Sequence, residues 1–159
     1  MMSRILALTV GVVLACATLS AQAAENIVVF GPNQDLAAGA MALQVGNYDE
    51  GVRLTRRGLK IEKSSKDRAT GLSNLCAGLV GLRLYAEALV SCDQSLALKD
   101  RNWHVYNNRA LAFLGLGRVE RARMDMNRGL ELKPGAGKLL KVAEMINARA
   151  APMLAEATD

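Results

Sequence analysis

Side chains that commonly perform catalysis or bind metals are few in this 159-residue chain. His104 is the only histidine, which excludes a histidine cluster for a metal ion. Cys16, Cys76 and Cys92 form neither a C-x-x-C pair nor the spacing of a zinc site. The spacing of serine, histidine and aspartate indicates no catalytic triad. We therefore expect that the protein is not an enzyme and that it holds no metal and no other cofactor.

The segment PGAGK, residues 134–138, has some likeness to a phosphate-binding loop. That motif requires a serine or threonine after its lysine, and a glycine five positions before its last glycine. Here Leu139 follows Lys138, and Leu132 occupies the glycine position. The segment is better interpreted as a turn between two helices.

The first 23 residues, MMSRILALTVGVVLACATLSAQA, have the order of a secretory signal peptide. A short basic start with Arg4 precedes an apolar run, and a small-x-small end closes it at Ala23. Cleavage after Ala23 predicts a periplasmic or secreted protein. One alternative is a lipoprotein anchored at Cys16, because VLAC resembles a lipoprotein processing box. A retained membrane anchor is the third interpretation.

The composition predicts one domain with an aliphatic core. Aromatic residues make up only 4% of the chain, so the core must come mainly from leucine, valine, alanine and methionine. The formal net charge is +5. We expect no nucleic acid as a partner, because the protein is predicted to be exported and offers few aromatic side chains for base stacking.

A repeat explains the spacing of small residues in GRVERARMDMNRGLELKPG, residues 117–135. Residues 103–136 follow the 34-residue tetratricopeptide pattern. In this pattern the first helix carries an aromatic residue and small residues, the second helix carries a small and a large residue, and a proline ends the repeat. The matching residues are Tyr106, Ala110, Phe113, Ala122, Met126 and Pro134. A copy at 69–102 carries Tyr85, Ala88, Cys92 and Ser95, and a weaker copy at about 32–65 carries Gly46, Tyr48, Gly51 and Gly58.

The chain thus resembles the tetratricopeptide-repeat (TPR) family, over residues 32–136, and is interpreted as an exported bacterial protein of this kind. The resemblance implies an all-α fold, a right-handed superhelical array of three helix-turn-helix hairpins. An amphipathic helix at 137–149 is expected to cap the last hairpin. Residues 24–31 form an N-terminal extension, and residues 150–159 a flexible tail. Arg109, Cys76 and Asp100 depart from the usual residues of the pattern.

The resemblance also places Cys76 and Cys92 opposite each other within the second hairpin. A disulfide between them is plausible in an exported protein, because such a protein meets an oxidising compartment. Two buried thiols that pack as small apolar residues are the alternative.

In this family the first helices line a concave face that binds extended peptides. By repeat position, the lining here is rich in amides and nearly uncharged: Asn33, Leu36, Ser73, Asn74, His104, Asn107, Asn108 and Leu111. Asparagine can both donate to and accept from a peptide backbone. Capping or bracing of neighbouring helices is the alternative role for these asparagines. Because the lining has no lysine or arginine by repeat position, we expect it to disfavour ligands that end in a carboxylate.

A basic stretch at residues 53–68 has seven lysines and arginines against two acids. Its basic face comprises Arg53, Arg56, Arg57, Lys60 and Lys63. One interpretation of these basic residues is a solvated outer face of the array. The alternative is weak contact with an anionic membrane or with envelope phosphate.

The sequence favours a non-enzymatic adaptor or scaffold of the bacterial cell envelope that binds a segment of another protein in its groove. The alternative is a structural or surface-associated envelope protein that uses the basic convex face, with or without a lipid anchor. An enzyme, or an accessory subunit of one, is the third class. Self-association through the ends of the array is compatible with each.

Overall fold

The computed structural model describes the backbone of residues 33–156 and the side chains of residues 33–149. The predicted signal peptide, Cys16 and the predicted extension at 24–31 lie outside the described residues. Within the described part the chain is entirely helical apart from its turns. No helix in that part combines the length and apolar character that crossing a membrane requires.

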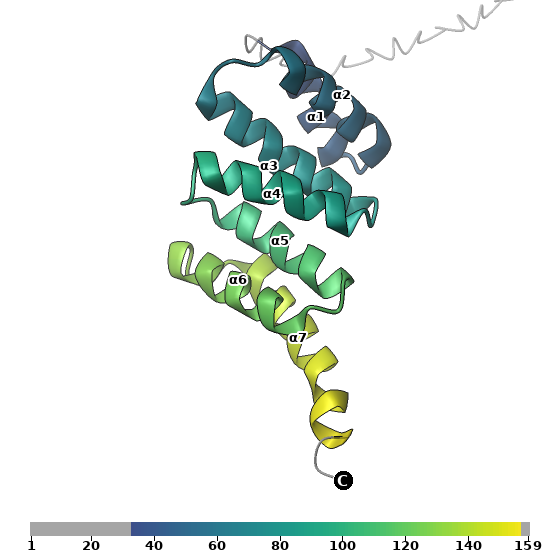
Figure 1. Ribbon diagram of the computed structural model, residues 1–159, viewed down its shortest axis with the longest axis vertical. Helices are drawn as coiled ribbons and strands as arrows, with labels where there is room; N and C mark the ends of the chain where they lie inside the picture. The colour runs from purple at the N-terminus through teal and green to yellow at the C-terminus, as the bar shows by residue number, and fades with distance from the viewer. Residues whose placement is uncertain (1–32, 157–159) are drawn as a thin grey trace, which may run out of the picture.

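Three helical hairpins stack in chain order, and a seventh helix follows them (Figure 1). The helices are α1 (Gln34–Gln44), α2 (Tyr48–Ile61), α3 (Ser65–Gly81), α4 (Tyr85–Leu98), α5 (Trp103–Gly115), α6 (Val119–Leu132) and α7 (Gly137–Glu156). The predicted all-α array of three hairpins with a capping helix is confirmed. One boundary differs, because α7 runs on to Glu156 where a tail from residue 150 was expected. Six of the seven residues from 150 to 156 are alanine, methionine, leucine or glutamate, which favour helix, and the exception is Pro152.

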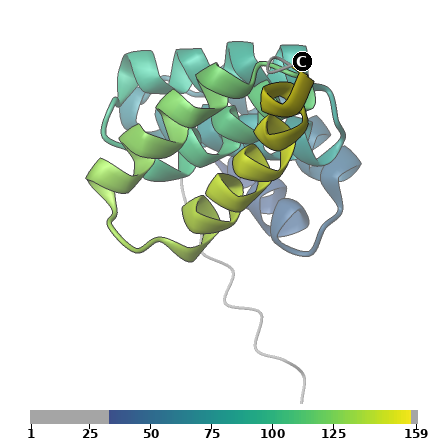
Figure 2. The ribbon, with the colours of Figure 1, turned by 90° about the horizontal axis from the view of Figure 1, so that it is seen from below.

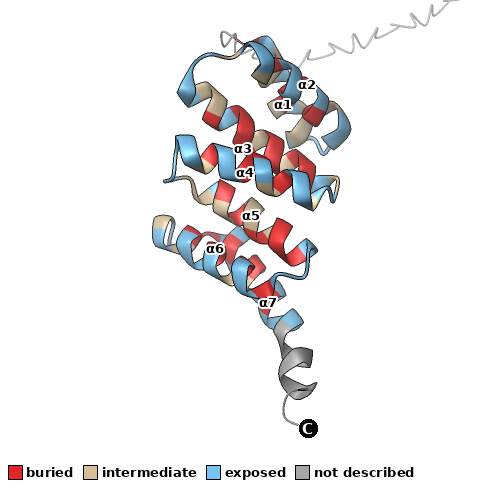
Figure 3. Cartoon of the chain, viewed as in Figure 1, coloured by how far each residue is buried: buried red, intermediate tan, exposed pale blue. Residues whose placement is uncertain are grey.

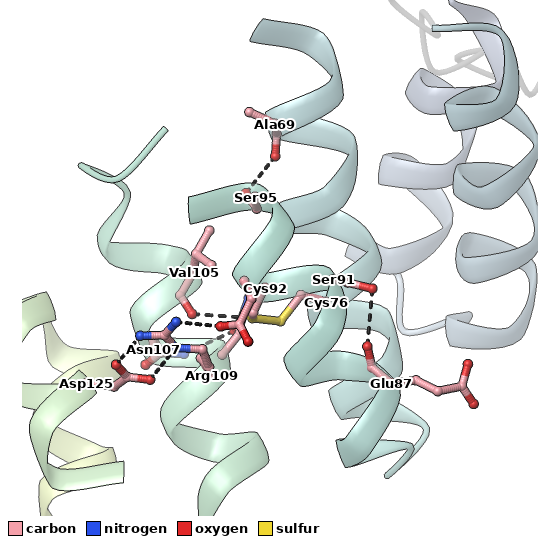
Figure 4. Close-up of a disulfide and its surroundings, with 12 residues drawn as sticks. Ala69, Cys76, Glu87, Ser91, Cys92, Ser95, Val105, Asn107, Arg109 and Asp125 are labelled. Carbon is pink, nitrogen blue, oxygen red and sulfur yellow. Dashed lines mark hydrogen bonds and ion pairs between the residues drawn. A yellow bond between two sulfur atoms is a disulfide. The ribbon is translucent and has the colours of Figure 1, made fainter. Parts of the chain in front are cut away.

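In each hairpin, one residue of the first helix faces one residue of the second helix at the same repeat positions. These pairs are Gly39–Thr55, Cys76–Cys92 and Ala110–Met126, each separated by 16 residues. A Cβ atom on Gly39 would lie 2.5 Å from Thr55 Oγ1, so only glycine fits there without movement. In the second hairpin the pair is a disulfide with a Cα–Cα distance of 5.3 Å (Figure 4). Both cysteines are fully buried between α3 and α4.

Each hairpin stacks on the next through a tyrosine and a glycine. The ring of Tyr48 lies against Gly81, and the ring of Tyr85 lies against Gly115. A Cβ atom added at Gly81 would come within 2.7 Å of the first ring, and one at Gly115 within 2.3 Å of the second. The absence of a side chain at both glycines therefore lets consecutive hairpins approach closely.

The capping helix α7 closes the core of the third hairpin. Leu139, Val142 and Ile146 are buried, and the last two pack with Phe113 and Met126 of α5 and α6. Figure 2 shows α7 lying across the end of the stack, and Figure 3 shows the buried residues that run through the array. Without α7 this apolar surface of α5 and α6 would face water.

Arg109, one of the three residues that depart from the repeat pattern, joins three helices through a partly buried ion cluster (Figure 4). Its Nε and Nη2 donate to the two carboxylate oxygens of Asp125 on α6 at 2.7 and 2.6 Å. Its Nη1 donates to Asp93 on α4 at 2.6 Å. The hydrogen bonds to Asp125, more than any other contact, raise the pKa of Arg109. The departure at position 109 is therefore compensated by two carboxylates.

Candidate functional site

A pocket of about 350 Å³ opens on the side of the array formed by the first helices of the hairpins. It lies between α3, α5 and the start of α7. Its lining is almost wholly amide, hydroxyl and small side chains: Thr70, Ser73, Asn74, Ala77, Asn102, His104, Asn107, Asn108 and Lys138. We call this the concave pocket.

Helix geometry brings these side chains to one face. On α3, Ser73 and Ala77 are four residues apart, as are Thr70 and Asn74, so all four project on the same side. His104, Asn107 and Asn108 follow the same spacing on α5. The array then repeats each position after 34 residues, which sets Asn108 beside Asn74 on the next hairpin.

Several polar groups of the pocket have no hydrogen-bond partner in the described part of the chain, although Thr70 and Asn102 each bond to a backbone group of their own segment. Asn107 is buried, and its Nδ2 donates to Asn108 Oδ1 at 3.2 Å, whereas its own Oδ1 has no hydrogen-bond partner within the described part of the chain. Asn74 makes no side-chain hydrogen bond there either. Amide donors and acceptors are thus available along the pocket for a ligand's backbone.

Lys138 is the only side chain of the lining that is charged at neutral pH. Partial burial, and to a smaller extent the charge of Lys138, lower the pKa of His104 below its ordinary value of 6.5, so His104 is neutral there. No carboxylate lines the pocket. The expectation that the groove lacks lysine and arginine was therefore wrong. The repeat pattern was followed only as far as residue 136, so the capping helix was not included in the expected lining.

The structure brings five of the eight predicted groove residues into the concave pocket: Ser73, Asn74, His104, Asn107 and Asn108. Asn33 is placed elsewhere and braces the first hairpin. Its Oδ1 accepts from the backbone N–H of Leu36 at 3.2 Å and caps α1, while its Nδ2 donates to the carbonyl of Gly58 at 2.9 Å. Asparagine directly before a helix is a common cap, and this signal was present in the sequence.

The two predicted groove leucines take part in packing between helices. Leu36 lies against Gly58 and Gly71, at the contact between the first two hairpins. Leu111 packs against the core of the third hairpin and the capping helix. The structure does not bring either leucine into the concave pocket. The sequence prediction also missed Lys138 as a lining residue, although Lys138 lies 34 residues after His104.

The predicted basic face is largely neutralised by ion pairs. Arg53 pairs with Glu50, Arg56 with Glu87, and Arg57 with Asp35. With Lys60 and Asp49, these arginines line a hollow of about 500 Å³ over α2. Lys63 is exposed beyond it. The charge that this surface presents is therefore smaller than the count of basic residues indicates.

Metal binding finds no support in the described part of the chain. Histidine, cysteine, aspartate and glutamate form no cluster of three or more there that could hold an ion.

Comparison with known proteins identifies the fold through solved structures. No family model matches the chain, and no curated protein matches its sequence. The first TPR domain of human RPAP3 superposes with a TM-score of 0.66 at 23% identity, over 74% of this chain and 91% of that one. A TPR-like protein of Chlorobium tepidum gives a TM-score of 0.62 at 25% identity, over 75% and 91%.

A third structure is the second TPR domain of human RPAP3, solved in complex with the HSP70 peptide SGPTIEEVD. It superposes with a TM-score of 0.63 at 21% identity, over 74% of this chain and 98% of that one. These likenesses agree with the stacked hairpins and with the 34-residue spacing described above. The chain therefore has the fold of a tetratricopeptide-repeat domain.

Proposed function

We propose that this protein is a non-enzymatic interaction module that binds an extended segment of another protein in the concave pocket. The observation that carries the proposal is the pair Asn74 and Asn108. These amides occupy equivalent positions on adjacent hairpins and line the same pocket. Asn74 makes no side-chain hydrogen bond within the described residues, and Asn108 accepts from Asn107 through Oδ1 and keeps its Nδ2 donor for a ligand. An extended peptide presents backbone N–H and C=O groups along its length, and amides can hold these without reading side-chain charge.

The fold supports the same proposal by analogy. One structure with this fold, the second TPR domain of human RPAP3, was solved with a bound peptide. Fold alone does not assign function, so the pocket and not the fold is the main support for this proposal.

The site of action that we propose is the bacterial cell envelope. The N-terminal 23 residues read as an export signal, and the Cys76–Cys92 disulfide suits an oxidising compartment. Intact-mass analysis of the exported protein tests this. A chain that begins at Ala24 is expected, whereas a lipid on Cys16 would select the anchored alternative, and a chain that keeps its first residues would contradict both.

The binding test uses short random peptides displayed on phage, selected against protein purified after expression of the full chain. Peptides that enrich are then titrated against the wild type and against the Asn74→Ala, Asn108→Ala variant. Two amide contacts with the peptide backbone predict a loss of affinity of about tenfold or more. Asn127→Ala, an exposed position on α6, is the matched control and should leave affinity unchanged.

Three results would count against the proposal. Selection could enrich no peptide, the double variant could bind as well as the wild type, or the control could lose as much affinity as the double variant. The second result would move attention to the basic face. Sedimentation with vesicles of anionic lipid would then test that alternative, with Lys60→Gln and Lys63→Gln as the variants.

A further inference from the structure

The first helix of the array has a side that no described helix covers. Within the described part of the chain α1 packs only on α2 and α3, and it lies at one end of the stack (Figure 1). Ala38, Met41 and Val45 are exposed there, Met41 by 57% and Val45 by 81%. They follow one another at intervals of three and four residues, so they share one side. We call this the outer face of α1.

The outer face of α1 carries no charge, unlike the helix at the opposite end of the stack. Asp35 is the only charged residue of α1, and it pairs with Arg57 on α2. α7, by contrast, exposes Lys141, Glu144 and Arg149. The outer surface of a terminal repeat is usually polar, because water covers it. The composition of α1 therefore indicates that another apolar segment covers its outer face.

The residues directly before α1 supply such a segment. Residues 26–30, NIVVF, are uncharged and include four consecutive apolar side chains that favour an extended conformation. Asn33 fixes the point at which this segment joins the array, because it is buried and its Nδ2 donates to the carbonyl of Gly58 at 2.9 Å. Gly31 and Pro32 stand between, and a Gly-Pro pair is typical of a turn. The sequence thus allows the chain to reverse before α1 and to run back along it.

The length of this segment matches the length of α1. Five extended residues span about 17 Å, at roughly 3.3 Å per residue. The 11 residues of α1 also span about 17 Å, at about 1.5 Å per residue. Because the segment is covalently attached beside α1, its effective concentration there is on the order of millimolar, which favours it over a second protein molecule.

We propose that residues 26–30 pack back along the outer face of α1 and cover the first hairpin, as α7 covers the third. Alternate side chains of an extended segment point to opposite sides, so two of the four apolar side chains contact α1 and the other two do not. The partner of this surface is the protein's own N-terminal segment, and not a second copy or a membrane. The inference concerns α1 and is independent of the ligand proposed for the concave pocket.

Disulfide trapping tests the contact. Ile27→Cys and Val28→Cys are each combined with Met41→Cys in the full chain, and the purified proteins are oxidised with glutathione disulfide. Neighbouring residues of an extended segment point to opposite sides, so one of the two variants should form an intramolecular disulfide with position 41 at least about fivefold more than the other. Non-reducing peptide mapping by mass spectrometry measures both fractions.

Lys60→Cys is the matched control partner for the same two variants. Lys60 is exposed and lies two residues from Gly58, so it is close to the attachment point of the segment but on α2. A segment without a fixed place would reach position 60 as readily as position 41, whereas a docked segment should pair with position 41 alone. Equal trapping of Ile27→Cys and Val28→Cys, or equal trapping at positions 41 and 60, would overturn the inference.

Hydrogen exchange measures the consequence for α1. A variant in which the four apolar residues become serine should exchange its α1 amides about tenfold faster or more, because the helix loses its cover, while exchange in α6 stays the same. The substitutions are Ile27→Ser, Val28→Ser, Val29→Ser and Phe30→Ser. Unchanged exchange in α1 would contradict the inference. A wild-type dimer, or binding to lipid vesicles, that Met41→Arg abolishes would show a different occupant of the outer face and would also overturn it.

Discussion

Arg83 occupies a backbone conformation that glycine adopts in the two other hairpins. Its φ is 61°, while Gly46 and Gly117 at the equivalent turns have φ of 79° and 72°. A left-handed conformation costs a residue with a side chain about 1–2 kcal/mol. The turn of the second hairpin therefore has arginine at a position where glycine would avoid this steric cost.

Arg83→Gly should increase the free energy of unfolding by about 1 kcal/mol, because glycine removes the steric cost of the left-handed turn. Urea denaturation followed by circular dichroism measures this. Arg118→Gly is the matched control, since Arg118 has φ of −88° and therefore has no left-handed conformation for glycine to relieve. A decrease in stability for Arg83→Gly would show that this turn is not strained.

Arg109 and Asp125 replace an ordinary pair of repeat residues. The equivalent positions one repeat earlier are Leu75 and Ser91, both buried. Asp125 is 7% exposed and Arg109 is 21% exposed, so the ion pair carries a cost of desolvation that Leu75 and Ser91 do not.

Asp125→Ser alone should lower the free energy of unfolding by about 1–3 kcal/mol, because Arg109 would keep only the exposed Asp93 as a partner. Adding Arg109→Leu should recover most of this loss, because the two residues then match the second hairpin. Chemical denaturation of both single variants and the double variant forms a complete cycle. Simple addition of the two single effects would contradict the coupling.

Residue types alone could predict some of these roles but not others. Asn74 and Asn108 occupy equivalent repeat positions and line one pocket, because helical periodicity determines which residues share a face. Asn33 was assigned to the groove by the same rule, yet it caps α1 because it stands directly before the helix. The partners of Arg109 were not predictable, since they lie on two other helices.

At the scale of elements, the Cys76–Cys92 disulfide joins the helix that carries half of the concave pocket to the helix behind it. Thr70, Ser73, Asn74 and Ala77 all lie on α3, and the disulfide fixes α3 to α4. The third hairpin places Ala110 and Met126 at the same positions and packs without a covalent bond. The disulfide should therefore add stability without being required for the fold.

Reduction should lower the free energy of unfolding by about 3 kcal/mol, because opening the loop increases the entropy of the unfolded chain. Urea denaturation with and without a thiol reductant measures the difference. A Cys76→Ala, Cys92→Met variant, which copies the third hairpin, should fold and should not respond to reductant. Equal stability of the oxidised and reduced wild type would contradict this account.

The capping helix presents alternating buried and exposed residues, which allows a sharp test of its role. Leu139 is fully buried against Gly129, while Leu140 is 47% exposed. Leu139→Ala should lower the free energy of unfolding by about 2–4 kcal/mol, because it leaves a cavity in the core. Leu140→Ala should change it much less. Thermal or urea denaturation measures the free energy of unfolding of the two variants. A similar decrease for both would mean that α7 does not cover the core of the third hairpin.

At the scale of the whole molecule, the sequence was sufficient to predict the architecture. A 34-residue spacing of small and large residues predicts stacked hairpins, because each hairpin can bury its apolar face only against a neighbour. The 34-residue spacing from His104 could have indicated Lys138 as a lining residue, whereas the angle at which the capping helix crosses the last hairpin depends on packing beyond the repeat. Asp35 and Glu87 form ion pairs with arginines of the predicted basic face and so reduce its net charge. The sequence did not indicate these pairs, because both acidic residues lie on other helices.

In the function that we propose, a partner segment binds between α3, α5 and α7. The most direct measurement is photo-crosslinking of a selected peptide that carries a photoreactive group, with the labelled residues located by mass spectrometry. We expect labels on residues that line the concave pocket, such as Asn74, Asn108 and Lys138, and their loss when unlabelled peptide competes. Labels concentrated on α2, α4 and α6 would place the ligand on the convex side and contradict the account.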